Sequence, residues 1–213
     1  MNSFSQASQD IFVLTMLKYK TNGVYLEIGS NCPQFNSNTC SLYNQFNWTG
    51  LMVEFDKNFE FSYKISRPLS HHIFDDARNI DYFDFLEKNN YPKNIDYLQI
   101  DLDAENRSTL DVLEYFDKHI FDTYKFATVT FEHDFYRENY FDTRKISREI
   151  FLKHGYIMVF KDVNWNSDEE CNYYSFEDWY IHPSLVDMNH VNRFKTDEIL
   201  FHKDIKNRLL QNT

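Results

Sequence analysis

Glycine and proline are scarce in this sequence, with four of each among 213 residues. That scarcity excludes collagen-like, linker-like and low-complexity chains, which need one or both residues in quantity. No apolar run approaches the ~18 residues that span a bilayer, and the start, MNSFSQASQD, lacks the basic flank and apolar block of a secretory signal. The three cysteines are odd in number and lack metal-site spacing, which is typical of a reducing compartment. We therefore expect a cytoplasmic protein with no membrane span.

Positive charge is also in short supply. Lysine and arginine number 22 against 33 aspartates and glutamates, so the net charge is −11. Such a balance opposes binding to a phosphate backbone, and nucleic acid is not an expected partner. The length suits a single domain over residues 1–213, and a 42% apolar fraction is enough for a sizeable core. The oligomeric state stays open, with a homodimer as one possibility.

Apolar stretches of strand type alternate with stretches of helical period along the chain. Strands are predicted at residues 24–29, 50–54, 69–74, 95–101, 126–131, 156–160 and 179–181. Helices are predicted at residues 6–18, 39–46, 57–66, 82–88, 108–119 and 144–154. This alternation predicts an α/β fold with a mainly parallel sheet. Within the domain we expect an N-terminal helical segment (1–21), a core (22–186) and a peripheral tail (187–213).

Acidic residues stand at the ends of four predicted strands. They are Glu27, Glu54, Asp101 and Glu132. Open α/β sheets bind ligands at the carboxyl ends of their strands, near the point where the strand order reverses. Each acid taken alone is more often an ordinary strand terminus. Together they predict one polar pocket at an edge of the sheet.

The turn after the first strand reads Glu27-Ile28-Gly29-Ser30-Asn31. A glycine there lets a ligand approach the backbone closely. The G-x-G-x-x-G fingerprint is absent, which disfavours a nicotinamide dinucleotide, whereas one glycine with an upstream acid suits a sulfonium or amine ligand. Glu54, 27 residues after Glu27, is placed to accept hydrogen bonds from both ribose hydroxyls of an adenosine cofactor.

Two further groups of polar residues follow the later strands. Asp101 and Asp103 have the period-two spacing that lets both carboxylates point the same way, and Glu132, His133 and Asp134 follow the next strand. Carboxylates and an imidazole from neighbouring strand ends are suitable ligands for Mg²⁺ or Mn²⁺. The alternative is structural: Asp103 and Asp134 as helix N-caps, and His133 as a core residue.

A series of stretches in this order resembles the FkbM family of class I S-adenosylmethionine-dependent methyltransferases. The stretches are SQASQD (5–10), YLEIGSN (25–31), SNT (37–39), WTGLMVE (48–54), DYLQIDLD (96–103), TFEHD (130–134) and EDWYIHP (177–183). The resemblance covers roughly residues 5–186. It implies a Rossmann-like, doubly wound, mostly parallel seven-stranded sheet with helices on both faces.

The resemblance also implies roles for individual residues. For S-adenosylmethionine, it places Glu27, Gly29, Ser30 and Asn31 around the methionine part, Glu54 at the ribose, Asp76 at the adenine, Gln6 and Gln9 closing over the site, and Asp101 beside the methyl group. Many family members read D-x-E-G-x-E where this chain has Asp101-Leu102-Asp103-Ala104-Glu105-Asn106. The missing glycine leaves the role of Asp103 open.

Related sugar O-methyltransferases imply a divalent cation as well. By that similarity Asp101, Glu132 and His133 are the metal ligands and Asp103 is the base. Without a metal, His133 or His182 becomes the candidate base, although His182 has an equally good structural role.

The function that follows is methyl transfer to a hydroxyl of a sugar, nucleotide sugar or glycan. The hydroxyl must lose its proton, so the site must supply a base, a metal or both. One alternative is a catalytically idle module that binds the cofactor or a sugar. Another is a methyltransferase for a nitrogen or carboxyl acceptor, and a carboxyl acceptor needs a basic pocket and no general base.

Overall fold

The computed structural model describes residues 3–165 and 174–211, in which seven strands form one sheet. The strands are β1 (Val24–Ile28), β2 (Thr49–Glu54), β3 (His71–Phe74), β4 (Asn94–Ile100), β5 (Lys125–Glu132), β6 (Ile157–Asn164) and β7 (Ser175–Ile181). The α-helices are α1 (Gln9–Met16), α2 (Cys40–Phe46), α3 (Glu60–Ser66), α4 (Tyr82–Lys88), α5 (Ser108–His119), α6 (Thr143–Lys153), α7 (Met188–Val191) and α8 (His202–Gln211). Short 3₁₀ turns are η1 (Lys57–Phe59), η2 (Ala77–Asn79) and η3 (Tyr140–Asp142).

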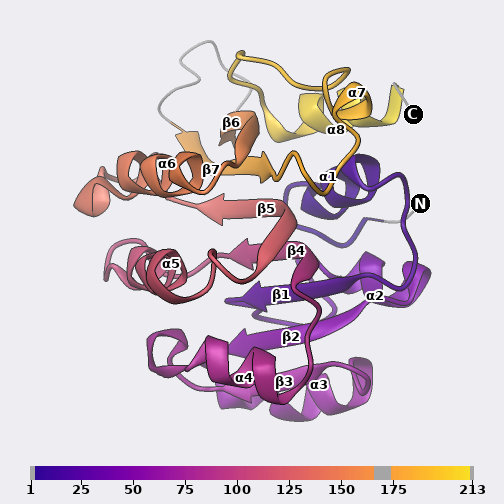
Figure 1. The fold of residues 1–213 in the computed structure, drawn as a ribbon, viewed down its shortest axis with the longest axis vertical. Coiled ribbons are helices and arrows are strands. Elements are labelled where there is room, and N and C mark those ends of the chain that lie inside the picture. The colour runs from indigo at the N-terminus through magenta and orange to yellow at the C-terminus, as the bar shows by residue number, and fades with distance from the viewer. Residues whose placement is uncertain (1–2, 166–173, 212–213) are drawn as a thin grey trace.

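The strand order confirms the predicted doubly wound α/β fold. It is β3-β2-β1-β4-β5-β7-β6, and β7 runs antiparallel to both of its neighbours (Figure 1). The pairs that join β3, β2, β1, β4 and β5 are all parallel. The chain builds outward from β1 in one direction and then returns to add β4 on the other side of β1. This reversal opens a crevice at the carboxyl ends of the strands.

Helices cover both faces of the sheet, with α5 and α6 on one side and α1 and α2 on the other (Figure 1). Neighbouring strand residues point to opposite faces, so Leu26 packs in the core beneath α4, α5 and α6, whereas Tyr25 packs in the core beneath α1, α2 and α3. Both side chains are fully buried. Because the strands are covered on both faces, they read as continuous apolar runs in the sequence.

Several predicted boundaries differ from those in the structure. Helix α5 has the predicted bounds, but α1 begins at Gln9, three residues later than expected. Strand β6 continues beyond residue 160 to Asn164, and β7 begins at Ser175, four residues before the predicted 179. Polar residues interrupt the apolar pattern in both extensions, which is why the sequence pattern missed them.

The segment after residue 187, expected as a peripheral tail, carries α7 and α8. Its apolar residues Val191, Phe194, Ile205 and Leu209 are buried with those of α1. This segment therefore completes the core on the α1 face of the sheet.

Two further expectations from the sequence concern a membrane span and the cellular compartment. No helix in the described part of the chain has the length and apolarity needed to cross a lipid bilayer. Cys32 and Cys40 are free thiols, and Cys171 lies outside the described residues. The cytoplasmic location stays a prediction from the sequence.

Candidate functional site

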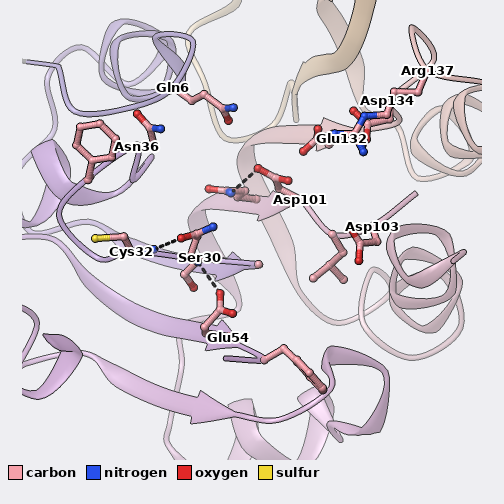
Figure 2. Close-up of a pocket in the computed structure, with 16 residues that line it drawn as sticks. Gln6, Ser30, Cys32, Asn36, Glu54, Asp101, Asp103, Glu132, Asp134 and Arg137 are labelled. Atoms are coloured by element: carbon pink, nitrogen blue, oxygen red, sulfur yellow. Dashed lines mark hydrogen bonds and ion pairs between the residues drawn. The ribbon is translucent and has the colours of Figure 1, made fainter. Parts of the chain in front are cut away.

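A cavity of about 520 Å³ lies at the carboxyl ends of β1, β2, β4 and β5. It is lined by Gln6, Gly29, Ser30, Asn31, Cys32, Phe35, Asn36, Glu54, Phe55, Gln99, Asp101, Leu102, Asp103, Glu132, Asp134 and Arg137. Three of the four strand-end acids, Glu54, Asp101 and Glu132, face it from separate strands (Figure 2). This volume is within the usual range for small-molecule sites, ~300–1,000 Å³.

The glycine turn after β1 forms one wall. Gly29 has a φ of 83°, and a Cβ on it would lie 1.7 Å from the carbonyl oxygen of Asp101, so only glycine fits. The hydroxyl of Ser30 donates to the carbonyl oxygens of Glu27 and Val53, at 2.9 and 3.0 Å. These bonds tie the turn to β1 and β2, and they hold its backbone against the cavity.

Glu54 ends β2 and fixes the next part of the wall. Its carboxylate accepts the N–H of Asn31 at 2.6 Å and the N–H of Asp56 at 2.8 Å. The Asn31 side chain in turn accepts the N–H of Cys32 at 2.6 Å. The loop after β1 and the end of β2 are therefore held together by Glu54.

Glu27 lies behind this wall and does not line the cavity. It is fully buried and accepts hydrogen bonds from Thr39 Oγ1 at 2.7 Å and Ser37 Oγ at 3.4 Å. Burial raises the pKa of Glu27 to about 7, against the opposing effects of Arg67 and of these hydrogen bonds. Glu27 therefore supports the loop that follows β1, and it reaches a ligand only through that loop.

The segment before α1 brings Gln6 to the cavity. Asp10 anchors it by accepting hydrogen bonds from Ser3 Oγ at 2.8 Å, Ser5 Oγ at 2.7 Å and the Phe4 N–H at 3.1 Å. Gln6 lines the cavity, and its role in closing over the cofactor stays a prediction.

Gln9, the other glutamine expected over the cofactor, points elsewhere. It is buried and donates to Glu177 Oε1 at 2.6 Å. Gln9 therefore belongs to the buried core beneath the site and does not line the cavity.

The far wall of the cavity is acidic. Burial raises the pKa of Asp101, an effect partly offset by a hydrogen bond with Glu132 and reinforced by the charges of Asp134 and Asp103. Burial and the charge of Asp101 raise the pKa of Glu132 well above its ordinary value. Two carboxyls this close in a poorly solvated place favour a shared proton. The Gln99 amide contacts Asp101 Oδ2 at 3.4 Å.

Asp103 stands at the rim of this wall. It is exposed and accepts the Asn106 amide at 3.3 Å. Asp101 and Asp103 both line the cavity, but β4 ends at Ile100 and the intervening Leu102 lines the cavity too, so the period-two spacing of a strand does not account for their direction.

His133 lies away from the cavity, although Glu132 and Asp134 on either side of it line the wall. Its ring is buried, and its Nε2 lies 3.9 Å from Asp162 Oδ1 and 3.7 Å from Asp178 Oδ1. Among the described residues, these three are the group whose ligand atoms converge at metal-binding distances.

The predicted metal set of Asp101, Glu132 and His133 is not brought together, so these residues do not fit a shared ion. The His133 group does not need one, because Arg148 already neutralises the acids: it pairs with Asp178 at 2.7 Å and Asp162 at 2.8 Å. The structure therefore offers no support for a metal ion in this site.

Two other predicted site residues lie outside the cavity. His182 follows β7 at the opposite edge of the sheet, where its N–H donates to Ala127 and its ring packs edge-on against Tyr156. Asp76 caps η2 and pairs with Arg78 at 2.6 Å. Neither side chain lines the cavity.

Several lining residues were missed by the sequence pattern. They are Cys32, Phe35, Asn36, Phe55, Gln99, Leu102 and Arg137. Phe55 directly follows Glu54, and Gln99 precedes Asp101 by two residues, so position next to a strand-end acid was an available signal. Arg137 lies in a loop, where no periodicity points to it.

Comparison with solved structures finds this fold among methyltransferases. A TehB-like S-adenosylmethionine-dependent methyltransferase from Corynebacterium glutamicum has a TM-score of 0.51 at 9% identity, covering 85% of this chain and 89% of that chain. A protein provisionally assigned as an rRNA methylase from Clostridium thermocellum has a TM-score of 0.52 at 9% identity, covering 85% and 99%. Fibrillarin from Aeropyrum pernix, solved with S-adenosylmethionine, is less similar, with a TM-score of 0.45 at 15% identity over 81% and 76%.

At such low identities the likeness shows the fold alone: this chain has the fold of S-adenosylmethionine-dependent methyltransferases. No family model matches the chain, and the comparison with curated proteins found no match either. Membership of the FkbM family therefore stays a prediction.

Proposed function

We propose that this protein is an S-adenosylmethionine-dependent methyltransferase of the FkbM type that acts on a hydroxyl of a sugar, nucleotide sugar or glycan. The observation that carries the proposal is a single cavity with two unlike walls. One wall holds the glycine turn and Glu54, and the other holds the paired carboxyls of Asp101 and Glu132. A cofactor and a proton acceptor therefore have places side by side.

The first wall fits the cofactor. Gly29, Ser30 and Asn31 line the cavity and would face the methionine part. Glycine is required at position 29 because a Cβ there would meet the Asp101 carbonyl. Glu54 and Gln6 both line the cavity, and we assign Glu54 to the ribose hydroxyls and Gln6 to the cover over the cofactor. The acidic lining suits the positive sulfonium, since an opposite charge stabilises it in a poorly solvated site. When bound, S-adenosylmethionine supplies an electrophilic methyl group on sulfur.

The second wall handles the proton. A half-buried carboxyl with a raised pKa, such as that of Asp101, works as a general base nearer to neutral pH than an ordinary aspartate does. Asp101, beside the first wall, takes the proton of the acceptor hydroxyl. The deprotonated oxygen would then accept the methyl group that S-adenosylmethionine supplies, and S-adenosylhomocysteine would be the leaving group. The enzyme contributes alignment of oxygen, carbon and sulfur. His133 and His182 have no part in this step, because neither lines the cavity.

Cofactor binding is tested with Glu54→Gln. Replacing the charged acceptor removes one to two charge-assisted hydrogen bonds to the ribose, each worth about 1.5–3 kcal/mol. We expect calorimetry with S-adenosylmethionine to show at least about tenfold weaker binding. Glu60→Gln, on the exposed face of α3, is the control and should bind as the wild type does. Equal affinity for both variants would contradict the assignment of Glu54.

Catalysis is tested with Asp101→Asn. We expect turnover, measured as release of S-adenosylhomocysteine with a panel of sugars, to fall about 10²–10⁴-fold while cofactor binding persists. The control is Asp122→Asn, which removes an equal charge from a side chain that is 90% exposed. Unchanged turnover in Asp101→Asn would contradict the assignment of Asp101 as the base. Cofactor binding without turnover on any acceptor would favour an idle binding module.

A further inference from the structure

The side chain of Gln9 links two parts of the chain that meet near the site. Its Oε1 accepts the N–H of Ala7 at 2.8 Å, and its Nε2 donates to Glu177 Oε1 at 2.6 Å. Gln9 and Glu177 are both buried, so water does not compete for these bonds. The Ala7 bond fixes which end of the amide accepts, because a backbone N–H can only donate. The residue next to Gln6 is therefore tied to β7.

The backbone between Ala7 and Gln9 is strained. Ser8 has a φ of 74°, in the left-handed region that a serine rarely adopts. The Ser8 side chain makes no capping hydrogen bond to the first turn of α1, so capping does not account for this conformation. The turn does bring the Gln9 amide back onto the Ala7 N–H, two residues before it. Such strain persists only where the surrounding contacts impose it, and it clusters at functional sites.

Glu177 connects this link to the acidic wall. In the antiparallel pairing of β5 with β7, Glu177 stands opposite Glu132. Burial raises the pKa of Glu177 well above its ordinary value, and the charge of Asp101 adds to this effect, which favours the neutral form of the acid. A neutral acid accepts through its carbonyl oxygen, as a glutamine does. Glu177→Gln would therefore preserve the hydrogen bond from Gln9.

Gln6 itself is exposed, lines the cavity (Figure 2) and lies between two anchored residues. On one side, Ser5 Oγ donates to Asp10, which belongs to α1 and so to the same part of the chain. On the other side, the Ala7 N–H donates to Gln9, which continues the link to the sheet. Gln9 thus provides the polar contact that ties the residues beside Gln6 to the strand next to the acidic wall.

We propose that Gln9 is a positioning residue that holds Gln6 over the cofactor, with Glu177 as its fixed partner. This inference rests on the proposed function, in which Gln6 covers S-adenosylmethionine. Gln9 does not touch the cofactor. It acts through the Ala7 backbone, and without it the segment that carries Gln6 loses its link to β7.

The first measurements compare single variants by calorimetry with S-adenosylmethionine. Gln9→Met removes both hydrogen bonds with little change in side-chain length, and we expect at least about tenfold weaker binding. Glu177→Gln keeps an acceptor for the Gln9 amide and should bind within about threefold of wild type. Gln45→Met, on the exposed side of α2, is the matched control and should bind as wild type does.

The double variant Gln9→Met with Glu177→Met separates positioning from stability. With both partners apolar, no buried acceptor is left without its donor, so the urea midpoint should recover relative to Gln9→Met alone. Ala7 still lacks its acceptor, so cofactor binding should stay at least about tenfold weaker than in wild type. Amide hydrogen exchange, followed by mass spectrometry, should be faster in residues 3–8 and unchanged in α5.

Three results would overturn the inference: wild-type affinity in Gln9→Met, affinity that recovers together with stability in the double variant, or exchange that rises in α5 as much as in residues 3–8. Each of the last two would mean that Gln9 acts only by stabilising the core. Failure of the proposed function looks different, because wild type itself would then not bind S-adenosylmethionine. That result would overturn both proposals, whereas the inference alone fails in a protein that binds the cofactor.

Discussion

Replacing Glu27 by glutamine should change how the stability of this protein depends on pH. Burial raises the pKa of Glu27 from 4.5 to about 7. Below pH 4.5 the carboxyl is protonated in both the folded and the unfolded chain. As the pH rises through 7, the folded chain must carry a buried charge, and the stability that the proton provided is lost.

The size of this loss follows from the two pKa values. At about 1.4 kcal/mol per pH unit over the roughly 2 units between pH 5 and the folded pKa, wild type loses about 3 kcal/mol of unfolding free energy that Glu27→Gln, which has no proton to lose, retains. Buried carboxyls such as Glu177 also have raised pKa values, but they are present in both proteins and cancel in the difference.

Urea unfolding of both proteins at about pH 5 and about pH 8.5 measures the effect. The midpoint of Glu27→Gln should move upward relative to wild type by about 1–3 M between the two pH values, given a typical dependence of about 1–3 kcal/mol per molar urea. Glu60→Gln is the control: a hydrogen bond with Lys64 lowers the pKa of Glu60, so this carboxyl is ionised in both states throughout the range and the difference from wild type should stay constant. A difference between Glu27→Gln and wild type that stays constant across this pH range would refute the argument.

Two further substitutions test the supports of the site. Arg148→Met should lower the unfolding free energy by about 3–5 kcal/mol, because it leaves the buried charge of Asp178 without its partner. A loss below about 1 kcal/mol in urea titration would contradict this. Gly29→Ala should cost more than the ~1–2 kcal/mol of a left-handed alanine, since its Cβ meets the Asp101 carbonyl, and it should abolish S-adenosylmethionine binding in calorimetry. Gly155→Ala, at a φ of 79° with only an ordinary contact of 4.0 Å from the Cβ to His182 Nε2, should lose only the backbone term and keep binding. Similar losses for the two alanine variants would refute the steric argument.

Much of the fold was predictable because strand and helix periods are local properties of the sequence. The predicted bounds of α5 match the structure because its buried residues Leu110, Leu113 and Phe116 recur at helical spacing. The mainly parallel pairing of the sheet was predictable from the alternation of strands with helices, which favours parallel neighbours. The polar second half of β6 carries no such signal, because Asp162 and Asn164 are buried there as polar residues.

The site was predictable where side-chain direction follows from the strand. Glu54, Asp101 and Glu132 meet because parallel strands end at one edge of the sheet. His133 points away because it is one residue past Glu132, and successive side chains alternate. The position of His182 could not be predicted, for a different reason. Strand β7 runs antiparallel, so its end lies at the opposite edge of the sheet, and the sequence does not give the direction of a strand.

The placement of β7 has a consequence for a chain emerging from the ribosome. This strand inserts between β5 and β6, both of which are synthesised before it. Until residue 181 has been synthesised, one edge of the apolar β5 is unpaired and exposed to other nascent chains. Intermolecular strand pairing starts at such unpaired edges. Correct folding of this protein therefore requires that the β5 edge stay unpaired until β7 has been synthesised.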